Sequence, residues 1–479
     1  MSVRYDTERW AARRRPFDDL EREVVALSRA ESHGDSERMI DALRYALSFS
    51  RLTEVRNVDG LDVDVSGINQ LYAMEVREAV AARLRDARPM WALYRVLPEL
   101  VARTRAARAS VLEHLPIDRE SLEEEVTTRK FALVCGGGGG AGYAYSGCFE
   151  VLDRAGLVPD LVVGTSIGAL LGMFRARYQR FDAASLVQAA KRLSWSRVFR
   201  VLETESRYGL PAALRLYLRS ALRGMFLRDH GIPLRMSDME IPLYVVVAGI
   251  TVDALKHDLH YYEHLLDASG QTSLRSRVRN AAKAIGVVRE FLSRRDALKQ
   301  IVCGRDPGTL EFDVLDAAGF SAAVPGVIHY DVLREDLRMR GLLDQLYAMY
   351  GITRLGEGGL VANVGAKIAW ESVVGGALGR RNVTVLALDC FWPNARTPVW
   401  YPLQQAVRSA NVRDNQRFCD VYLPLPRTLS PMNLVPALRD TLAAMQWGRE
   451  AMEPQVGLLK DLCRPLAVLP DATTSPSAS

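Results

Sequence analysis

Between residues 130 and 178 the sequence alternates twice between a short apolar run and a helical segment, with a turn of small residues at each junction. The runs are FALVC at 131–135 and LVV at 161–163, and the helical segments cover 146–155 and 167–178. Short apolar runs bounded by glycine are typical of strands buried on both faces, and their alternation with helices indicates parallel strands. The pattern therefore predicts a three-layer α/β/α domain with a mostly parallel sheet.

The remaining sequence predicts further elements on either side of this pattern. Apolar residues at helical spacing predict a helical N-terminal region, with arginines on its other faces. Strands are expected at 243–250 and 383–388, and helices at 276–299, 313–323 and 433–449. We expect four parts: a helical N-terminal region at 1–125, the α/β domain at 126–425, a C-terminal helix and extension at 426–470, and a disordered tail at 471–479.

Composition limits the classes of function. Hydrophobic residues make up 48% and charged residues 25% of the chain, the values of a globular protein with a sizeable core. Lysine and arginine number 62 against 57 acidic residues, so the net charge of +5 is too small for a dedicated nucleic-acid-binding protein. The six cysteines contain no CxxC pair and no metal-ligand spacing, which predicts buried thiols in a reducing compartment.

The sequence contains no segment with the character of a signal peptide or a membrane span. Residues 1–17 are charged throughout, whereas a signal peptide needs an apolar core. The uncharged stretch 131–149 is rich in glycine, and 161–174 is shorter than the ~20 residues of a spanning helix. We therefore expect a cytoplasmic protein whose membrane contact is peripheral. The arginines of 83–108 and the basic segment 276–299 could rest on anionic lipid, the alternative being a solvated helix face.

The strongest chemical feature is the turn Gly164-Thr165-Ser166-Ile167-Gly168, which follows the second apolar run. A serine between a strand and a helix, flanked by glycines, is typical of a nucleophile elbow. The glycines Gly164 and Gly168 are needed because a Cβ there would collide with neighbouring backbone. The start of the following helix would place N–H groups near a developing negative charge. The alternative is a small-residue turn without chemistry.

A second feature is the run from Gly136 to Gly140, followed by Ala141 and Gly142. Consecutive glycines allow N–H groups to point toward one place, as in an oxyanion hole or a phosphate cradle. A P-loop is excluded because no GK[ST] follows. A dinucleotide-binding GxGxxG can be read through Gly137, Gly139 and Gly142, but it leaves the serine turn unexplained.

A carboxylate completes the candidate catalytic set. Glu357 precedes two glycines, an arrangement consistent with an acid held on a turn that faces the serine. A Ser-His-acid triad is the rival interpretation, and the order of residues leaves only His329 with Asp313 or Asp316 for it. A metal site from His257, His260, His264 and Glu263 is a further alternative to plain surface or core histidines.

Together these segments resemble the patatin-like phospholipases over about residues 130–425. The family pattern is a glycine-rich loop, GxSxG about 25 residues later, and then DG[GA]. It matches here the glycine loop 137–142, the elbow GTSIG and the segment GEGGLVANVGAKIAWE at 356–371. The segment AAGFSAAVPGVI at 317–328 is similar to the family's small-residue stretch before Pro-Gly.

The resemblance implies a serine lipid acyl hydrolase that needs no metal or organic cofactor. Ser166 would be the nucleophile, Glu357 the base, and Gly137, Gly138, Gly139 and Gly140 the oxyanion loop, with the amides of Gly138 and Gly139 favoured. The chain departs from the family at Ala141, where the family has Lys or Arg, and at Glu357, where it has Asp. The longer side chain moves the carboxylate by roughly 1 Å, a displacement that can cost ~100-fold in rate.

The expected substrate is a phospholipid or a neutral lipid at a membrane surface. The N-terminal segments SFSRLTEVRN and NQLYAMEVREAV faintly resemble triacylglycerol lipases of the same superfamily, a hint toward neutral lipid. The alternative function is a catalytically weak lipid-binding or scaffold protein, which the Glu357 departure keeps open. Under the dyad interpretation, a Glu357 oxygen should lie within about 4 Å of the Ser166 hydroxyl.

Overall fold

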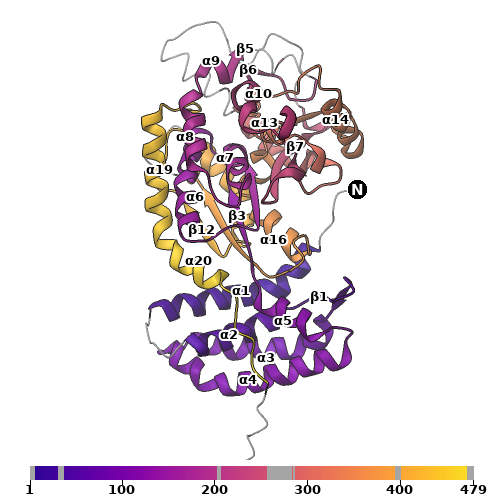
Figure 1. The fold of residues 1–479 in the computed structure, drawn as a ribbon, viewed down its shortest axis with the longest axis vertical. Coiled ribbons are helices and arrows are strands. Elements are labelled where there is room, and N and C mark those ends of the chain that lie inside the picture. Colours follow the sequence, from indigo (N-terminus) through magenta and orange to yellow (C-terminus); the bar gives the residue numbers. More distant parts are fainter. Residues whose placement is uncertain are drawn as a thin grey trace, which may run out of the picture. The chain divides into compact units, whose positions relative to one another are not determined.

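The computed structural model describes residues 6–30, 37–201, 207–255, 286–393 and 401–471, together with positions 261 and 283. The chain divides into two compact units (Figure 1). One unit contains Ala132–Ala369 and Val385–Val456, and it carries the candidate catalytic residues. The other contains Arg4–Phe131, Trp370–Thr384 and Gly457–Ser479.

The first unit is built around a mixed, mostly parallel sheet. Its strand order is β10-β7-β4-β3-β11-β12, and β8 also pairs with β7. β3 is parallel to β4, β4 to β7 and β11 to β12, whereas β8 and β10 run antiparallel to β7. The bounds are Lys130–Cys135 for β3, Leu161–Thr165 for β4, Leu243–Ile250 for β7, Leu298–Cys303 for β8, Arg354–Gly356 for β10, Val383–Asp389 for β11 and Val421–Pro424 for β12.

Helices cover both faces of this sheet. A methyl group added at Gly172 of α7 (Ile167–Ala176) would lie 3.3 Å from the side chain of Val162. One added at Gly365, just before α16 (Ala366–Val374), would lie 3.1 Å from Val163. Consecutive strand residues point to opposite faces, so α7 and α16 lie on opposite sides of the sheet. The three-layer α/β arrangement expected from the sequence is confirmed.

Most of the expected elements are present near their expected bounds. The first strand and helix are β3 and α6 (Tyr145–Arg154), and the later strands are β7 and β11. The helix expected at 313–323 is α13, Val314–Ser321. The C-terminal helix, α19, begins at Leu438 rather than at 433 and ends at Met452. Pro436 explains the later start, because proline disfavours helical backbone in the residue before it.

The helix expected at 276–299 differs from the structure at its C-terminal end. Residues 286–293 are helical, but β8 begins at Leu298 and pairs antiparallel with β7. Pairing with a buried strand outweighs the helical pattern there. Positions 276–282, 284 and 285 lie outside the described residues, as do 472–479 of the expected disordered tail.

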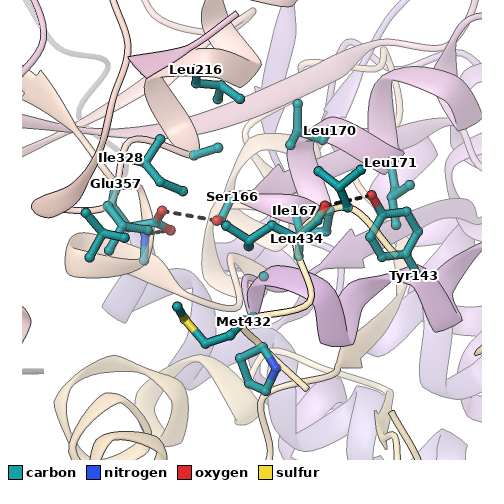
Figure 2. Close-up of a pocket in the computed structure, with 18 of the residues that line it drawn as sticks. Tyr143, Ser166, Ile167, Leu170, Leu171, Leu216, Ile328, Glu357, Met432 and Leu434 are labelled. Carbon is teal, nitrogen blue, oxygen red and sulfur yellow. Dashed lines mark hydrogen bonds between the residues drawn. The ribbon is translucent and has the colours of Figure 1, made fainter. Parts of the chain in front are cut away.

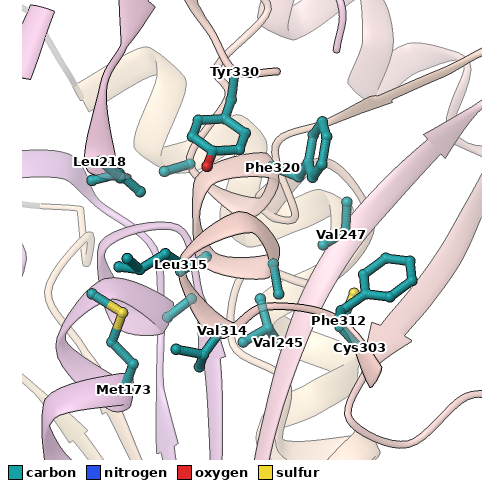
Figure 3. Packing of buried hydrophobic residues seen from close by; sticks show 14 of the residues in the cluster. Met173, Leu218, Val245, Val247, Cys303, Phe312, Val314, Leu315, Phe320 and Tyr330 are labelled. Atoms are coloured by element: carbon teal, nitrogen blue, oxygen red, sulfur yellow. The ribbon is translucent and has the colours of Figure 1, made fainter. Parts of the chain in front are cut away.

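A smaller sheet and several short helices lie beside the central sheet in the same unit. Its strands are β5 (Phe199–Val201), β6 (Ala212–Leu216) and β9 (Gly326–His329), in the order β5-β6-β9. The accompanying helices are α8 (Ala183–Arg192), α9 (Trp195–Val198), α10 (Leu218–Leu222) and α14 (Leu337–Tyr350). Figure 3 shows part of the core of this unit, where Val314, Leu315 and Phe320 of α13 pack beside Val245 and Val247 of β7.

The second unit is mainly helical, as expected for residues 1–125. Its helices are α1 (Thr7–Ala30), α2 (Glu37–Ser50), α3 (Ser66–Leu84), α4 (Pro89–His114) and α5 (Arg119–Thr127), which share an apolar core. A short hairpin of β1 (Glu54–Arg56) and β2 (Asp62–Asp64), which the helical pattern did not predict, separates α2 from α3. None of the helices in the described ranges has both the length and the apolar character needed to cross a membrane.

Candidate active site

Ser166 lies at a sharp turn between β4 and α7. Its backbone has φ 56° and ψ −123°, a positive φ that is uncommon outside glycine and costs about 1–3 kcal/mol. The two flanking glycines make this turn possible. A Cβ at Gly164 would lie 2.6 Å from the backbone of Ala169, and one at Gly168 would lie 2.1 Å from the Cys135 carbonyl oxygen. The local geometry of a nucleophile elbow is therefore present.

Glu357 faces Ser166 directly. It follows β10, and the Ser166 Oγ donates a hydrogen bond of 3.0 Å to Glu357 Oε2, as Figure 2 shows. The Gly359 N–H donates to the other carboxylate oxygen, Oε1, at 3.2 Å. This Oγ–Oε2 distance is shorter than the separation of about 4 Å that the dyad interpretation of the sequence allows. The longer glutamate side chain thus reaches the serine from the turn in which it sits.

The environment of Glu357 favours its neutral form. The residue is only 8% exposed. Burial raises the pKa of its carboxyl from 4.5 to about 8, while hydrogen bonds from the Gly359 N–H and the Ser166 hydroxyl oppose that rise. A pKa close to the working pH suits a group that must both accept and return a proton.

The glycine loop leaves two amides available beside the serine. The N–H of Gly137 donates to the Asn363 carbonyl at 3.1 Å, and that of Gly140 donates to the Pro431 carbonyl at 2.9 Å. Gly138 and Gly139 line the cavity at Ser166, and none of the hydrogen bonds among the described residues uses their N–H groups. Gly139 has φ 57° and is the first residue of a short 3₁₀ helix, Gly139–Ala144, whose first amides have no acceptor within it.

A large apolar cavity opens from the Ser166–Glu357 pair (Figure 2). Its volume is about 570 Å³, within the usual range for small-molecule sites. The described side chains that line it are apolar apart from Tyr143, Ser166, Glu357 and Asn363. One side is formed by α7 and α8 through Leu170, Phe174, Leu186 and Ala189, and by Leu193 directly after α8. Such a cavity suits a long hydrocarbon chain far better than a polar ligand.

The rival triad is not brought together. Asp313 and Asp316 instead bind Arg219 of α10, with Asp313 at 2.6 Å. His329 is buried, and its Nδ1 hydrogen-bonds to the Leu210 carbonyl at 3.0 Å. The acidic cluster of Asp313, Asp316 and Asp336 could by its geometry hold a metal ion, but Arg219 already supplies its counter-charge. The proposed histidine metal site, at 257, 260, 263 and 264, lies outside the described residues.

Two residues of the site were not singled out from the sequence. Asn363 lines the cavity and accepts the Gly137 N–H on its backbone carbonyl. Ser321 is fully buried, and its hydroxyl accepts a hydrogen bond of 2.8 Å from the Ser166 N–H. Both lie in segments with a family resemblance, but a single asparagine or serine among small residues gives no separate signal.

Comparison with known proteins gives a family match over the segment that contains these residues. Residues 133–370 match the family model of patatin-like phospholipases. The chain contains a patatin-like phospholipase domain. The matched residues include the glycine loop, the serine turn and Glu357, so the patatin-like domain coincides with the site described above.

Curated relatives match shorter parts of the chain. Lysophospholipase NTE1 of Chaetomium globosum is 39% identical over 77 residues, which is 16% of this chain and 5% of that protein. Lysophospholipase nte1 of Emericella nidulans is 43% identical over 60 residues, or 12% of this chain and 4% of the relative. Human patatin-like phospholipase domain-containing protein 6 is 31% identical over 140 residues, or 29% of this chain and 10% of that protein. The similarity to these relatives thus spans a small part of their length.

Proposed function

We propose that this protein is a serine lipid acyl hydrolase, with Ser166 as the nucleophile and Glu357 as the general base. The observation that carries the proposal is the 3.0 Å hydrogen bond from Ser166 Oγ to Glu357 Oε2 at the wall of an apolar cavity. The patatin-like domain and the lysophospholipase relatives support a lipid ester as substrate.

In the first half of the reaction, Ser166 Oγ attacks the ester carbonyl carbon while Glu357 accepts the hydroxyl proton. The carbonyl oxygen becomes an oxyanion, and the amides of Gly138 and Gly139 and the N-terminus of α7 are suited to stabilise it. The bond from the carbonyl carbon to the leaving alcohol then breaks. Glu357 returns the proton to that alcohol, and an acyl-serine ester remains.

In the second half, a water molecule attacks the acyl carbon and gives a proton to Glu357. The bond to Ser166 Oγ breaks as the fatty acid forms, and the proton passes from Glu357 to Ser166. The cycle therefore needs only one carboxylate that alternates between base and acid, which is why a pKa near 8 is suitable.

The acyl chain of the substrate fits the apolar side of the cavity. Ala189 of α8 is buried and lines this side, and its small side chain leaves room for the hydrocarbon. We expect Ala189→Phe to lower kcat/KM for a palmitoyl ester about 10- to 100-fold relative to a butyryl ester, because each methylene excluded from an apolar site costs about 0.8 kcal/mol. The measurement is the ratio of the two kcat/KM values.

The matched control is Ala184→Phe, since Ala184 is exposed on the same helix. That variant should keep the wild-type ratio of palmitoyl to butyryl hydrolysis. Equal ratios in Ala189→Phe and wild type would contradict acyl binding along α8.

Peripheral membrane contact is proposed for the turn between α3 and α4 together with the N-terminal end of α4, which carries Trp91 and Arg95. Trp91 is 58% exposed, and the guanidinium of Arg95 lies 4.8 Å from the centroid of its ring. Arg85 and Arg88 are exposed on the same turn. An aromatic ring among cationic side chains is suited to the headgroup region of an anionic bilayer, where each charge contributes about 1 kcal/mol.

Sedimentation with vesicles tests this contact. Binding to vesicles that contain phosphatidylserine should decrease as salt rises, and the triple variant Arg85→Gln, Arg88→Gln, Arg95→Gln should bind more than tenfold more weakly, since three charges contribute ~3 kcal/mol in all. Equal binding of the wild type to neutral and anionic vesicles would count against an electrostatic contact at this turn.

A further inference from the structure

Ser321 lies where the two halves of the candidate dyad meet. It is the last residue of α13, in the AAGFSAAVPGVI segment to which the reaction above assigns no role. Its hydroxyl accepts the Ser166 N–H at 2.8 Å and donates to the Val246 carbonyl at 2.6 Å. Its own carbonyl accepts the Gly358 N–H at 3.2 Å. One buried residue thus contacts the backbone of the nucleophile turn and that of the acid turn.

The orientation of these hydrogen bonds follows from the groups involved. A carbonyl can only accept, so the Ser321 proton must point toward Val246, which leaves a lone pair for the Ser166 N–H. Val246 lies opposite Thr165 in the register of β4 and β7. The Ser321 hydroxyl therefore links Ser166, the strained residue directly after β4, to the neighbouring strand β7.

Helix α13, which ends at Ser321, is packed closely against Tyr330. Phe320 packs edge-on against Tyr330, with ring centroids 5.1 Å apart (Figure 3). The Tyr330 hydroxyl donates to Asp316 at 2.5 Å. Gly319 permits this packing, because a Cβ there would lie 2.4 Å from the Tyr330 ring. The small residues of this segment thus place Ser321 at a fixed position relative to the core.

We propose that Ser321 is a positioning residue that holds Ser166 in its strained conformation and keeps the Ser166 hydroxyl within hydrogen-bonding distance of Glu357. The inference rests on the proposed function, because its readouts are those of the hydrolase. Without the hydroxyl, the Ser166 N–H has lost its acceptor and the turn can relax away from Glu357. Displacements of about 1 Å at reacting atoms can cost on the order of 100-fold in rate.

The test compares Ser321→Ala with wild type on a soluble butyryl ester. We expect kcat to fall about 10- to 100-fold while KM stays within about twofold, because the lost contact acts on the reacting atoms rather than on substrate binding. We also expect the midpoint of the pH–kcat/KM profile to move to higher pH. The Ser166 hydrogen bond lowers the pKa of Glu357, and no charged group contributes to that pKa among the described residues.

Ser146→Ala is the matched control. Ser146 is equally buried, but its hydroxyl has no hydrogen-bond partner within the described part of the chain. It should keep the wild-type kcat and pH midpoint. Ser321→Cys is a second variant, which keeps the shape of the side chain but replaces the hydroxyl with a thiol that forms only weak hydrogen bonds. We expect its kcat to lie between those of wild type and Ser321→Ala.

The outcomes separate the inference from the function on which it rests. If Ser321→Ala and Ser321→Cys, measured per folded molecule, retain the kcat and pH midpoint of Ser146→Ala, positioning by Ser321 is overturned while the hydrolase remains. If the folded wild type neither hydrolyses the ester nor reacts with a fluorophosphonate, the proposed function fails and this inference fails with it.

Discussion

Replacing Glu357 with aspartate is expected to lower the rate of ester hydrolysis about 100-fold, although aspartate is the usual acid in the family that the sequence resembles. The glutamate carboxylate lies 3.0 Å from Ser166 Oγ, and a side chain one methylene shorter on the same backbone would hold its carboxylate farther from the hydroxyl. The Glu357 N–H donates to the Ala323 carbonyl at 3.0 Å, so the backbone is not positioned to move forward for a shorter side chain.

Glu357→Gln should lower the rate further, on the order of 10⁴-fold, because an amide cannot accept the serine proton. The measurement is kcat/KM on a butyryl ester, with the melting temperature recorded for each variant. Glu371→Asp is the control for shortening a buried glutamate, since Glu371 and its hydrogen-bond donor Thr7 both belong to the unit that does not carry Ser166 and Glu357. If Glu357→Asp were as active as wild type or more active, the site would be an aspartate site damaged by substitution rather than one built around glutamate.

The second large effect concerns pH. We expect kcat/KM to rise with pH through a single ionisation near 8, the value to which burial raises the pKa of Glu357. Glu357 must be ionised to accept the serine proton, and the ionised fraction falls tenfold per unit below the pKa. The rate at pH 6 should therefore be roughly 100-fold below its plateau. A profile that is flat between pH 6 and 9 would contradict Glu357 as the base.

The same ionisation predicts how stability changes with pH. The carboxyl has a pKa of 4.5 in the unfolded chain and about 8 in the folded protein. Its contribution to stability is therefore complete below pH 4.5 and is lost as pH rises toward 8, because the unfolded chain releases the proton first. Activity lost at pH 6 cannot then be attributed to unfolding caused by this group, and melting temperatures at pH 6 and 8 check the point.

The sequence predicted the parts of the site that arise from local structure. β4 and α7 follow from an apolar run, a small-residue turn and a helical pattern, and these elements alone define the position of Ser166. The three-layer arrangement follows from the same alternation. Glu357 could be suggested from its two following glycines, but its distance to the serine depends on a turn whose backbone is fixed by Ala323.

The remaining parts depend on contacts between distant segments. Ser321 contacts Ser166 across 155 positions of sequence, and no periodicity or spacing marks it. The glycine run suggested four candidate oxyanion amides, and the family resemblance favoured those of Gly138 and Gly139. That the Gly137 and Gly140 amides are engaged by Asn363 and Pro431 is visible only in the folded chain. The apolar cavity likewise combines side chains from α7, α8 and later loops.

The most direct test of the Ser166–Glu357 hydrolase is labelling by a fluorophosphonate, followed by intact mass and peptide mapping. We predict one adduct per folded chain, located on Ser166, absent in Ser166→Ala and formed about 100-fold more slowly in Glu357→Asp. The labelling rate should also rise between pH 6 and 8 with the ionisation of Glu357. Folded wild-type protein that acquires no adduct, or acquires it at a residue other than Ser166, would contradict the account.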